Sequence, residues 1–255
     1  MVKPKQPGFF QEKDSSNLTF FLVLLVIVAV LGAKYFGFVP PFGTKVIKDD
    51  QPGADAPMIL VYTAHPTENY APAPPHADEI GDVVSVCRTL EESLKEQKLR
   101  AQMVTGQKPV PWRESFAEAR RVLLPVIEAA QGVAAVLDIH RDALDGRPEG
   151  YTTVTVAGRP IAKMLLVVGD VDNPYIEENL RFAEAVRAAL EARAPGVTRG
   201  VKVLHEALNG DLHPQALQVH VGEYYDNTVQ EALDAVPLLA GAVFDVLQTP
   251  MPALE

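Results

Sequence analysis

The sequence predicts an α/β domain built on a mostly parallel, twisted sheet with helices on both faces. Short apolar runs typical of buried strands alternate with longer segments in which apolar residues recur at helical spacing. Strands and helices that alternate in this way form βαβ units, which place the sheet between helical layers. A hydrophobic fraction of 47% and a charged fraction of 22% support a folded core over a disordered chain.

The predicted strands are short segments rich in Val, Ile, Leu and Thr. Residues 58–63 (MILVYT) and residues 133–139 (VAAVLDI) are continuous apolar runs of the buried type. Residues 152–156 alternate between apolar and polar side chains, which predicts a more exposed strand. The remaining predicted strands are residues 99–104, 164–168, 201–204 and 217–221.

Helices are predicted between and after these strands, at residues 78–98, 112–131, 174–193 and 227–247. The third of them has the clearest boundaries, with Glu177 in its first turn and Pro195 beyond its end. We expect Pro125 to kink the second helix. We expect Thr228 or Asn227 to cap the fourth helix.

An apolar segment precedes the domain and predicts one transmembrane helix at residues 18–39. Residues 18–33 carry no charge, and the whole segment is long enough to cross a bilayer. No A-x-A cleavage site follows it, so we expect an uncleaved anchor; a cleaved signal peptide and a buried hairpin are the alternatives. Residues 1–17 then form a short cytoplasmic N-terminus, the Pro-rich residues 40–57 a linker, and residues 58–249 the folded domain.

Charge and cysteine content exclude two classes of function. The net charge of -10 disfavours binding to polyanions, so nucleic acid is not an expected partner. Cys87 is the single cysteine, which excludes a disulfide framework and a cysteine-based zinc site. It lies in an apolar helical stretch, where we expect it to act as a small buried hydrophobe.

Two histidines follow predicted buried strands, and a carboxylate lies close to one of them. His65 comes just after residues 58–63, and His140 ends the run at 133–139. The carboxyl ends of parallel strands share one edge of a sheet, so both imidazoles can reach one crevice. Glu68 completes an H-x-x-E pattern, and two nitrogens with one carboxylate form a common ligand set for catalytic zinc.

The same residues have ordinary structural explanations, which the spacing alone leaves open. His65 can be a hydrogen-bonded loop histidine, and Glu68 can cap a helix or form a salt bridge. Asp138, Arg141 and Asp142 flank His140, where they can orient its imidazole or form a loop ion pair.

Several segments recur together, in a fixed order, in one protein family. They are ILVYTAHPTENY (59–70), LDIHRDA (137–143), VVGDVDNPYIEENLRFAEAV (167–186), PGVTRGV (195–201) and NGDLHPQALQVHVGEYYDNTVQEA (209–232). Through them the chain resembles the stage II sporulation protein P family, relatives of the zinc-dependent N-acetylmuramoyl-L-alanine amidases. The resemblance implies an amidase or zinc-peptidase type of fold. It also implies hydrolysis of the amide between muramic acid and the L-alanine of the peptidoglycan stem peptide, with a transglycosylase activity in some members.

The resemblance also implies roles for individual residues. His65, Glu68 and His140 match the ligands of Zn²⁺. Arg141 matches the arginine of the family's I-H-R-D motif, where it is a candidate to bind a stem-peptide carboxylate or to buttress the site; an ion pair with Asp142 is the alternative. Asp142 and Asn209 are candidates for substrate contact.

The sequence departs from the family pattern at three places. One histidine is missing before His65, and the family's N-Q-D-L is N-G-D-L at 209–212. The late strand of the family carries a glutamate as general base, and His220 stands in its place. His220 can act as the base or as a third nitrogen ligand, Glu223 can supply the missing carboxylate, or the chain can be inactive.

The sequence therefore predicts a cell-wall amidase held at the membrane by a single span, with residues 58–249 outside the cytoplasm. Its expected partners are peptidoglycan and proteins of sporulation or cell-wall remodelling. A catalytically degenerate peptidoglycan-binding or regulatory module is the alternative, and His220 is its main support. A zinc carboxypeptidase is a third and weaker possibility, because H-x-x-E with a distant histidine is also that family's ligand pattern.

Overall fold

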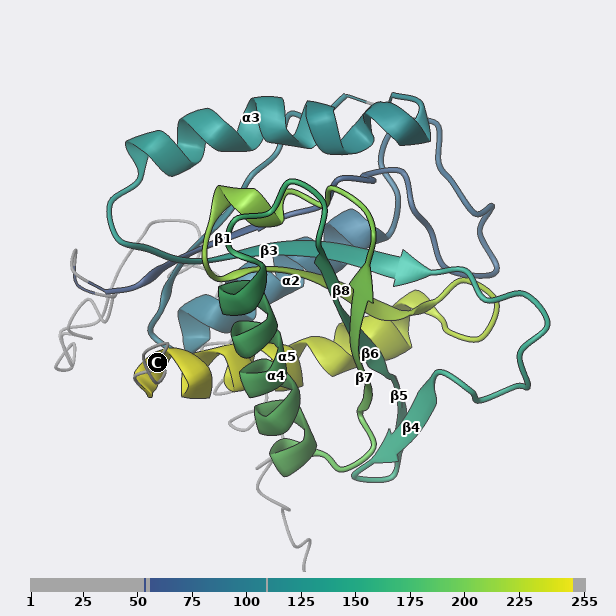
Figure 1. Ribbon diagram of the computed structural model, residues 1–255. Coiled ribbons are helices and arrows are strands. Elements are labelled where there is room, and N and C mark those ends of the chain that lie inside the picture. Colours follow the sequence, from purple (N-terminus) through teal and green to yellow (C-terminus); the bar gives the residue numbers. More distant parts are fainter. Residues whose placement is uncertain (1–52, 54–55, 109, 250–255) are drawn as a thin grey trace, which may run out of the picture. The chain divides into compact units, whose positions relative to one another are not determined.

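Residues 53, 56–108 and 110–249, which the computed structural model describes, contain a six-stranded sheet between two helical layers (Figure 1). The strands are ordered β2-β1-β3-β8-β6-β7. Their bounds are β1 Met58–Tyr62, β2 Arg100–Met103, β3 Val133–Asp142, β6 Met164–Gly169, β7 Thr198–Leu204 and β8 Ala216–Glu223. All neighbouring strands pair in parallel except β6 and β8, which pair antiparallel. The predicted mostly parallel sheet is confirmed. Its one departure is that β6 and β7, which are parallel to each other, run opposite to the other four strands.

Helices cover both faces of the sheet, as predicted, but unequally (Figure 1). The helices α2 (Val83–Glu96), α4 (Ile176–Arg193) and α5 (Val229–Gln248) pack on one face. On the other face lies α3 (Ser115–Ala129), which follows a 3-10 turn, η1 (Trp112–Glu114). We call the two sides the three-helix face and the α3 face.

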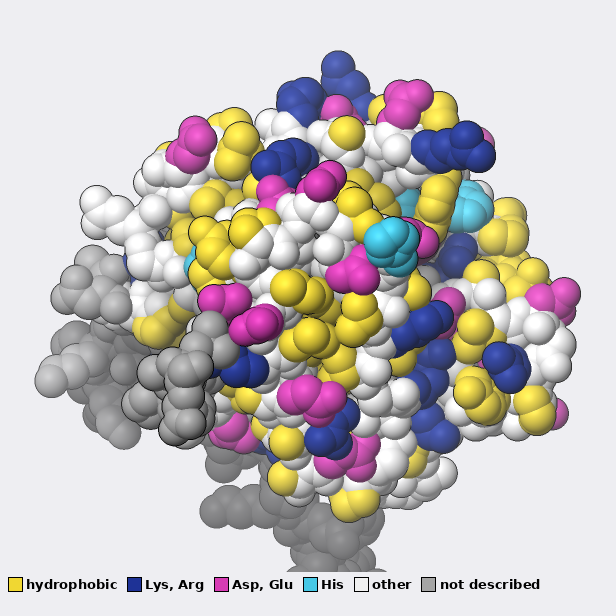
Figure 2. Space-filling view, in the orientation of Figure 1, with side chains coloured by type: hydrophobic (Ala, Val, Ile, Leu, Met, Phe, Trp, Pro, Cys, Tyr) yellow, Lys and Arg dark blue, Asp and Glu magenta, His cyan; other side chains and the backbone are white. Residues whose placement is uncertain are grey.

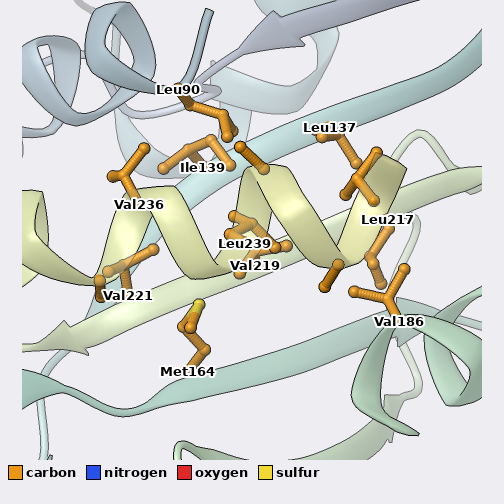
Figure 3. Packing of buried hydrophobic residues seen from close by; sticks show 14 of the residues in the cluster. Leu90, Leu137, Ile139, Met164, Val186, Leu217, Val219, Val221, Val236 and Leu239 are labelled. Carbon is orange, nitrogen blue, oxygen red and sulfur yellow. The ribbon is translucent and has the colours of Figure 1, made fainter. Parts of the chain in front are cut away.

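The main hydrophobic core fills the space between the sheet and the three-helix face (Figure 3). Along β3 and β8, every second side chain points into this core and is at most 3% exposed: Leu137, Ile139, Leu217, Val219 and Val221. Leu90 from α2 and Leu239 from α5 close over them. Because strand side chains alternate between faces, the residues in between point toward α3.

The α3 face has a smaller core and a polar region. Leu60 and Val136 pack there against Leu123 of α3. Further along the same strands, the side chains are Asp138 and His140 of β3 and Gln218 and His220 of β8. The strand alternation thus separates a dry, packed face from one that carries ionisable groups.

Several predicted boundaries need correction. β3 runs to Asp142, so His140 lies within the strand and not after it. The predicted strand at 152–156 is β4 (Thr153–Val156), which forms a separate hairpin with β5 (Arg159–Ala162). The sequence does not predict β5, because this strand is only four residues long and contains a proline.

The helix boundaries also differ in part. α2 begins at Val83 instead of residue 78, because Gly81 is packed against the backbone of the 66–68 turn and donates its N–H to the Pro66 carbonyl. α3 contains Pro125 and continues past it to Ala129. Thr228 caps α5 as predicted, in a reciprocal capping box with Glu231.

The predicted membrane span at residues 18–39 lies outside the described residues, as does nearly all of the linker at 40–57. Within the described part of the chain, no helix combines the length and the apolar character needed to cross a membrane.

Candidate functional site

The three predicted metal ligands meet on the α3 face, beside the carboxyl end of β1. His65 lies in the turn after β1, and its Nδ1 is 3.1 Å from Nδ1 of His140 in β3. The Glu68 carboxylate is 3.7 Å from His65 Nδ1 and 3.5 Å from His140 Nδ1. All three side chains are at most 5% exposed. We call this group, whose possible ligand atoms lie within 4.8 Å of one another, the His-Glu-His cluster.

The hydrogen bonds of His65 determine which of its ring nitrogens carries the hydrogen and which one presents a lone pair to the cluster. Nε2 of His65 lies 2.6 Å from the hydroxyl oxygen of Ser115. That hydroxyl donates its one hydrogen to the Trp112 carbonyl at 2.7 Å. The Ser115 oxygen can therefore only accept from His65, so Nε2 carries the hydrogen and Nδ1 presents a lone pair to the cluster.

Aromatic side chains of the η1–α3 segment enclose the same imidazole. The Trp112 ring is stacked on the His65 ring, with centroids 3.4 Å apart and planes at 11°. Phe116 contacts the His65 ring in an edge geometry at 5.3 Å. One turn of helix therefore supplies both the hydrogen-bond partner of His65 and the walls around it.

Asp138 acts on His140 from the same strand face. Its Oδ1 accepts the Ala64 N–H at 2.9 Å and lies 2.8 Å from His140 Nε2. The contact with His140 is close but lacks the linear geometry of a hydrogen bond, so we treat it as electrostatic. Burial lowers the pKa of His140, but the carboxylates of Asp138 and Glu68 outweigh burial and raise the pKa to about 10.

At pH 7, the other two members of the cluster are a neutral imidazole, His65, and an ionised carboxylate, Glu68. Burial and the neighbouring His140 lower the pKa of His65 to about 3. Burial raises the pKa of Glu68, but the surrounding His140, Arg141 and His65 lower it to about 2. In the metal-free chain, the proton on Nδ1 of His140 can thus form a hydrogen bond to the lone pair on Nδ1 of His65. The ionised carboxylate of Glu68 lies beside this hydrogen bond.

This arrangement fits a divalent metal ion. Two ring nitrogens and a carboxylate converge, which is a ligand set that zinc accepts. The outer ring nitrogens contact the oxygens of Ser115 and Asp138, as the outer nitrogens of metal-ligating histidines do. A metal ion would bring positive charge to the position of the bridging proton and replace it on binding.

His220 borders the cluster from β8. Its backbone is the register partner of His140, and the two imidazole centroids are 5.7 Å apart. Its Nε2 is 3.0 Å from the Gln218 amide nitrogen, and its Nδ1 is 3.9 Å from an Asp142 carboxylate oxygen. Burial and the charge of His140 lower the pKa of His220 to about 4, so the ring is neutral at pH 7.

Asp142 and Glu223, both named from the sequence, are engaged in other contacts. The Asp142 carboxylate pairs with Arg199 of β7 at 3.1 Å, a partner that the sequence did not reveal. Glu223 is 1% exposed, and its carboxylate accepts the Leu144 N–H at 3.1 Å. The structure therefore brings Asp142 beside His220 and ties Glu223 to the loop after β3.

The side chain of Arg141 supports the loop after Glu68. Its guanidinium donates to the carbonyls of Asn69 at 2.7 Å and Pro75 at 2.6 Å. Its backbone N–H donates to the Glu68 carboxylate at 3.1 Å. The Asp142 carboxylate does not pair with Arg141, because it binds Arg199 instead. These contacts favour the buttressing role among the alternatives predicted for Arg141.

Asn209 lies at the edge of a cavity next to the cluster. It adopts a left-handed backbone conformation with φ 58°, and its side-chain amide donates to the Phe116 carbonyl at 3.0 Å. The cavity has a volume of about 460 Å³ and lies between α3 and the loops that follow β6 and β7. Asn209 thus contacts Phe116, and the ring of Phe116 in turn contacts the ring of His65.

Sequence reasoning missed Ser115, Trp112 and Phe116, which lie about 50 residues after His65 and about 25 residues before His140 in the chain. The only local signal is a serine at the start of a predicted amphipathic helix, which ordinarily indicates a helix terminus. Their role depends on how α3 packs over β1, and periodicity does not specify that.

Comparisons with known proteins agree with this fold. A sequence model of the family described as Stage II sporulation protein P (SpoIIP) matches residues 27–244. The Stage II sporulation protein P of Bacillus subtilis (strain 168) is 26% identical over 200 residues, which cover 71% of this chain and 49% of that protein. The chain thus spans about half the length of this relative.

Two solved structures are similar in fold. The CwlD amidase from Clostridioides difficile, in complex with the GerS lipoprotein, has a TM-score of 0.52 and 11% identity, covering 75% of this chain and 96% of that one. The N-acetylmuramoyl-L-alanine amidase AmiC2 of Nostoc punctiforme has a TM-score of 0.48 and 12% identity, covering 76% and 98%. The first likeness shows that the fold is that of an amidase-like α/β domain, and at this identity it concerns the fold alone.

Proposed function

Because the chain belongs to the stage II sporulation protein P family, we propose that it is a peptidoglycan hydrolase acting in sporulation, which cleaves the amide between N-acetylmuramic acid and the L-alanine of the stem peptide. The observation that carries the proposal is the convergence of His65, Glu68 and His140 on one point. Zn²⁺ bound by these three residues would supply an activated water and polarise the scissile carbonyl. The chain's own side chains would position the substrate and move the protons.

His220 is the residue that we assign to proton transfer. Its ring borders the cluster at 5.7 Å from His140, and its lowered pKa of about 4 keeps it neutral at pH 7. A neutral imidazole can take a proton from the attacking water and return it to the amine that leaves. The Asp142 carboxylate, 3.9 Å from His220 Nδ1, is placed to stabilise the positive charge that forms on the ring.

The test of the reaction is mass analysis of the products released from purified peptidoglycan. We expect stem peptides with a free L-alanine amino terminus, no release in the presence of a chelator, and recovery when zinc is returned. Release of single carboxyl-terminal amino acids would instead identify a carboxypeptidase and contradict the proposal.

A binding or regulatory module on the same fold is the second candidate. The observation that favours it is the contact of His220 Nε2 with the Gln218 amide, which occupies the ring lone pair that a base needs. A chain that binds purified peptidoglycan and contains zinc, yet releases no product, would establish this candidate in place of the amidase.

We also propose that the domain acts outside the cytoplasm and is held at the membrane by residues 18–39. The presumed substrate lies on that side, and the apolar length of the segment supports a span. A reporter fused after Glu255 should be active only if it is of a type that works outside the cytoplasm. Activity of a cytoplasmic reporter at that position would overturn the assignment.

A further inference from the structure

Buried polar atoms that make no hydrogen bond lie close together on the α3 face of the sheet. Among the described residues, they include one oxygen of Asp138, one oxygen of Gln218 and Nδ1 of His220. On the surface shown in Figure 2, by contrast, acidic and basic side chains are interspersed and open to water. Because burial of an unpaired polar group is unfavourable, such a group usually meets an ordered water molecule.

Asp138 and Gln218 line one small cavity inside the domain. They are register partners on the neighbouring strands β3 and β8, and their exposed fractions are 2% and 7%. The cavity continues between β6 and the helical turn η2 (Gly210–Leu212). Its volume is about 10 Å³, taken as the space open to the centre of a water molecule. This is room for one water molecule and not for a larger ligand.

The two unpaired atoms of this cavity wall are both hydrogen-bond acceptors. Oδ1 of Asp138 accepts the Ala64 N–H, whereas its Oδ2 and the Oε1 of Gln218 have no partner among the described residues. Asn179, another polar residue of the wall, is fully used: its nitrogen donates to two backbone carbonyls, and its oxygen accepts from Asn173. A water molecule carries the two hydrogens that the two free oxygens require.

Gln218 also determines the state of the neighbouring His220. Its amide nitrogen, which can only donate, lies 3.0 Å from Nε2 of His220. Nε2 must therefore accept, and in a neutral ring the hydrogen then lies on Nδ1. Nδ1 is 3.9 Å from a carboxylate oxygen of Asp142, which favours the same tautomer. The orientation of one amide thus decides which ring nitrogen of His220 presents the lone pair.

We propose that a water molecule bound between Asp138 and Gln218 fixes the orientation of the Gln218 amide, and that Gln218 is thereby a positioning residue for His220. The water donates one hydrogen to each of the two oxygens, which leaves the amide nitrogen as the donor to His220. Asp138 also contacts Nε2 of His140 at 2.8 Å, so this chain of contacts joins the metal cluster to His220. Its role in catalysis rests on the proposed function, whereas the tautomer of His220 is a property of the folded chain.

The first test is nitrogen-15 NMR of the histidine rings in the full chain in detergent at pH 7, with the His220 signals assigned by their loss in His220→Ala. In the wild type, we expect Nδ1 of His220 to carry the hydrogen and Nε2 to be unprotonated. Gln218→Glu keeps the size of the side chain but replaces the donor with an acceptor, so Nε2 should gain a hydrogen. Gln102→Glu is the matched control, because Gln102 is an exposed glutamine of β2, and it should leave the His220 signals unchanged.

The second test is a crystal structure of the same chain. We expect one ordered water molecule within hydrogen-bond distance of Oδ2 of Asp138 and Oε1 of Gln218. It should be absent in Gln218→Met, which fills the same space without an oxygen acceptor. An empty cavity, or a direct hydrogen bond from the Gln218 amide to Asp138, would overturn the proposal. A wild-type Nε2 that carries a hydrogen, or an unchanged Nε2 in Gln218→Glu, would do the same.

The amidase assay separates this proposal from the proposed function. If the wild type releases no product while the NMR and crystal results hold, the proposed reaction is wrong and the water site stands. If the wild type is active, Gln218→Glu should lower kcat by about 10²-fold with KM and bound zinc unchanged, because Nε2 of His220 no longer offers a lone pair. An unchanged kcat beside a shifted tautomer would overturn the positioning role of Gln218. Circular dichroism of each variant checks that the fold is unchanged.

Discussion

On the three-helix face, β3 and β8 present Leu137, Ile139, Leu217 and Val219 to a closed apolar core; on the α3 face, the same strands present ionisable and amide side chains. Adjacent residues in the chain thus serve opposite purposes. Burial of aliphatic groups stabilises the domain, and a polar atom in this core, such as the Tyr70 hydroxyl, needs a hydrogen-bond partner. The α3 face carries buried charge, which is offset by close contacts between opposite charges, such as those of His140 with Glu68 and Asp138. The sheet therefore assigns stability to one face and chemistry to the other.

The largest expected effect comes from His220 on the α3 face. His220→Ala should lower the amidase rate by about 10²–10⁴-fold while bound zinc is retained, because a general base typically contributes that factor. His220→Glu restores the family's carboxylate and should keep or raise the rate. Amidase assays paired with elemental analysis measure both quantities.

Glu223→Gln is the control for this assignment, since Glu223 is tied to Leu144 and should be nearly silent in rate. If zinc is lost together with His220, the residue is a ligand. If Glu223→Gln loses the rate and His220→Ala does not, Glu223 is the base.

On the three-helix face, Ile139→Ala should lower the free energy of unfolding by about 2–5 kcal/mol, because it leaves a cavity in a closed core. Chemical denaturation of the metal-free chain measures this. Gln218→Ala, on the adjoining strand but the other face, should cost clearly less, about 0.5–1.5 kcal/mol, because within the chain the side chain loses only the contact of its amide nitrogen with His220 Nε2. Equal costs for the two variants would contradict the division between the faces.

Ser115→Ala tests whether the α3 face orients its ligands. Loss of the hydroxyl frees the His65 tautomer, and zinc affinity should fall by about 10–100-fold, the usual effect of removing such a partner. A competition titration with a metal-binding dye gives the affinity. Ser93→Ala is the matched control, because Ser93 is a buried helical serine away from the cluster. Unchanged affinity in Ser115→Ala would show that the contact has no role in metal binding.

The smallest effect is a pH dependence confined to the α3 face. The folded-state pKa of His140 is raised to about 10, above the unfolded value of about 6.5, so the metal-free folded chain binds the extra proton. Stability from this group is complete below pH 6.5 and declines as pH rises. We expect a measurable decline between about pH 6.5 and 8, below the ordinary titration of cysteine and tyrosine. His140→Gln should flatten this part of the profile; an unchanged slope would contradict the assignment.

The sequence was sufficient for the features that are local in the chain. The apolar runs at 58–63 and 133–139 correspond to β1 and β3, and they place His65 and His140 together because parallel strands end at one edge. The period-2 alternation of β8 places Gln218 and His220 on the face opposite Leu217. Each of these depends on side-chain alternation and strand direction alone.

Other features depend on packing between distant segments and were not predictable. An apolar run does not encode its direction, so the antiparallel pairing of β6 with β8 could not be inferred. The ion pair of Asp142 with Arg199 joins β3 to β7 across two other strands. The contact of Ser115 with His65 likewise exists only because α3 lies over the turn after β1.

The central claim is that the α3 face binds a metal ion through His65, Glu68 and His140. Elemental analysis of the purified chain, after dialysis against limiting zinc, tests it most directly. We predict one zinc per chain in the wild type, none in His65→Ala, and full occupancy in the surface control His205→Ala, whose side chain is 89% exposed. Equal zinc content in the wild type and His65→Ala would contradict the account.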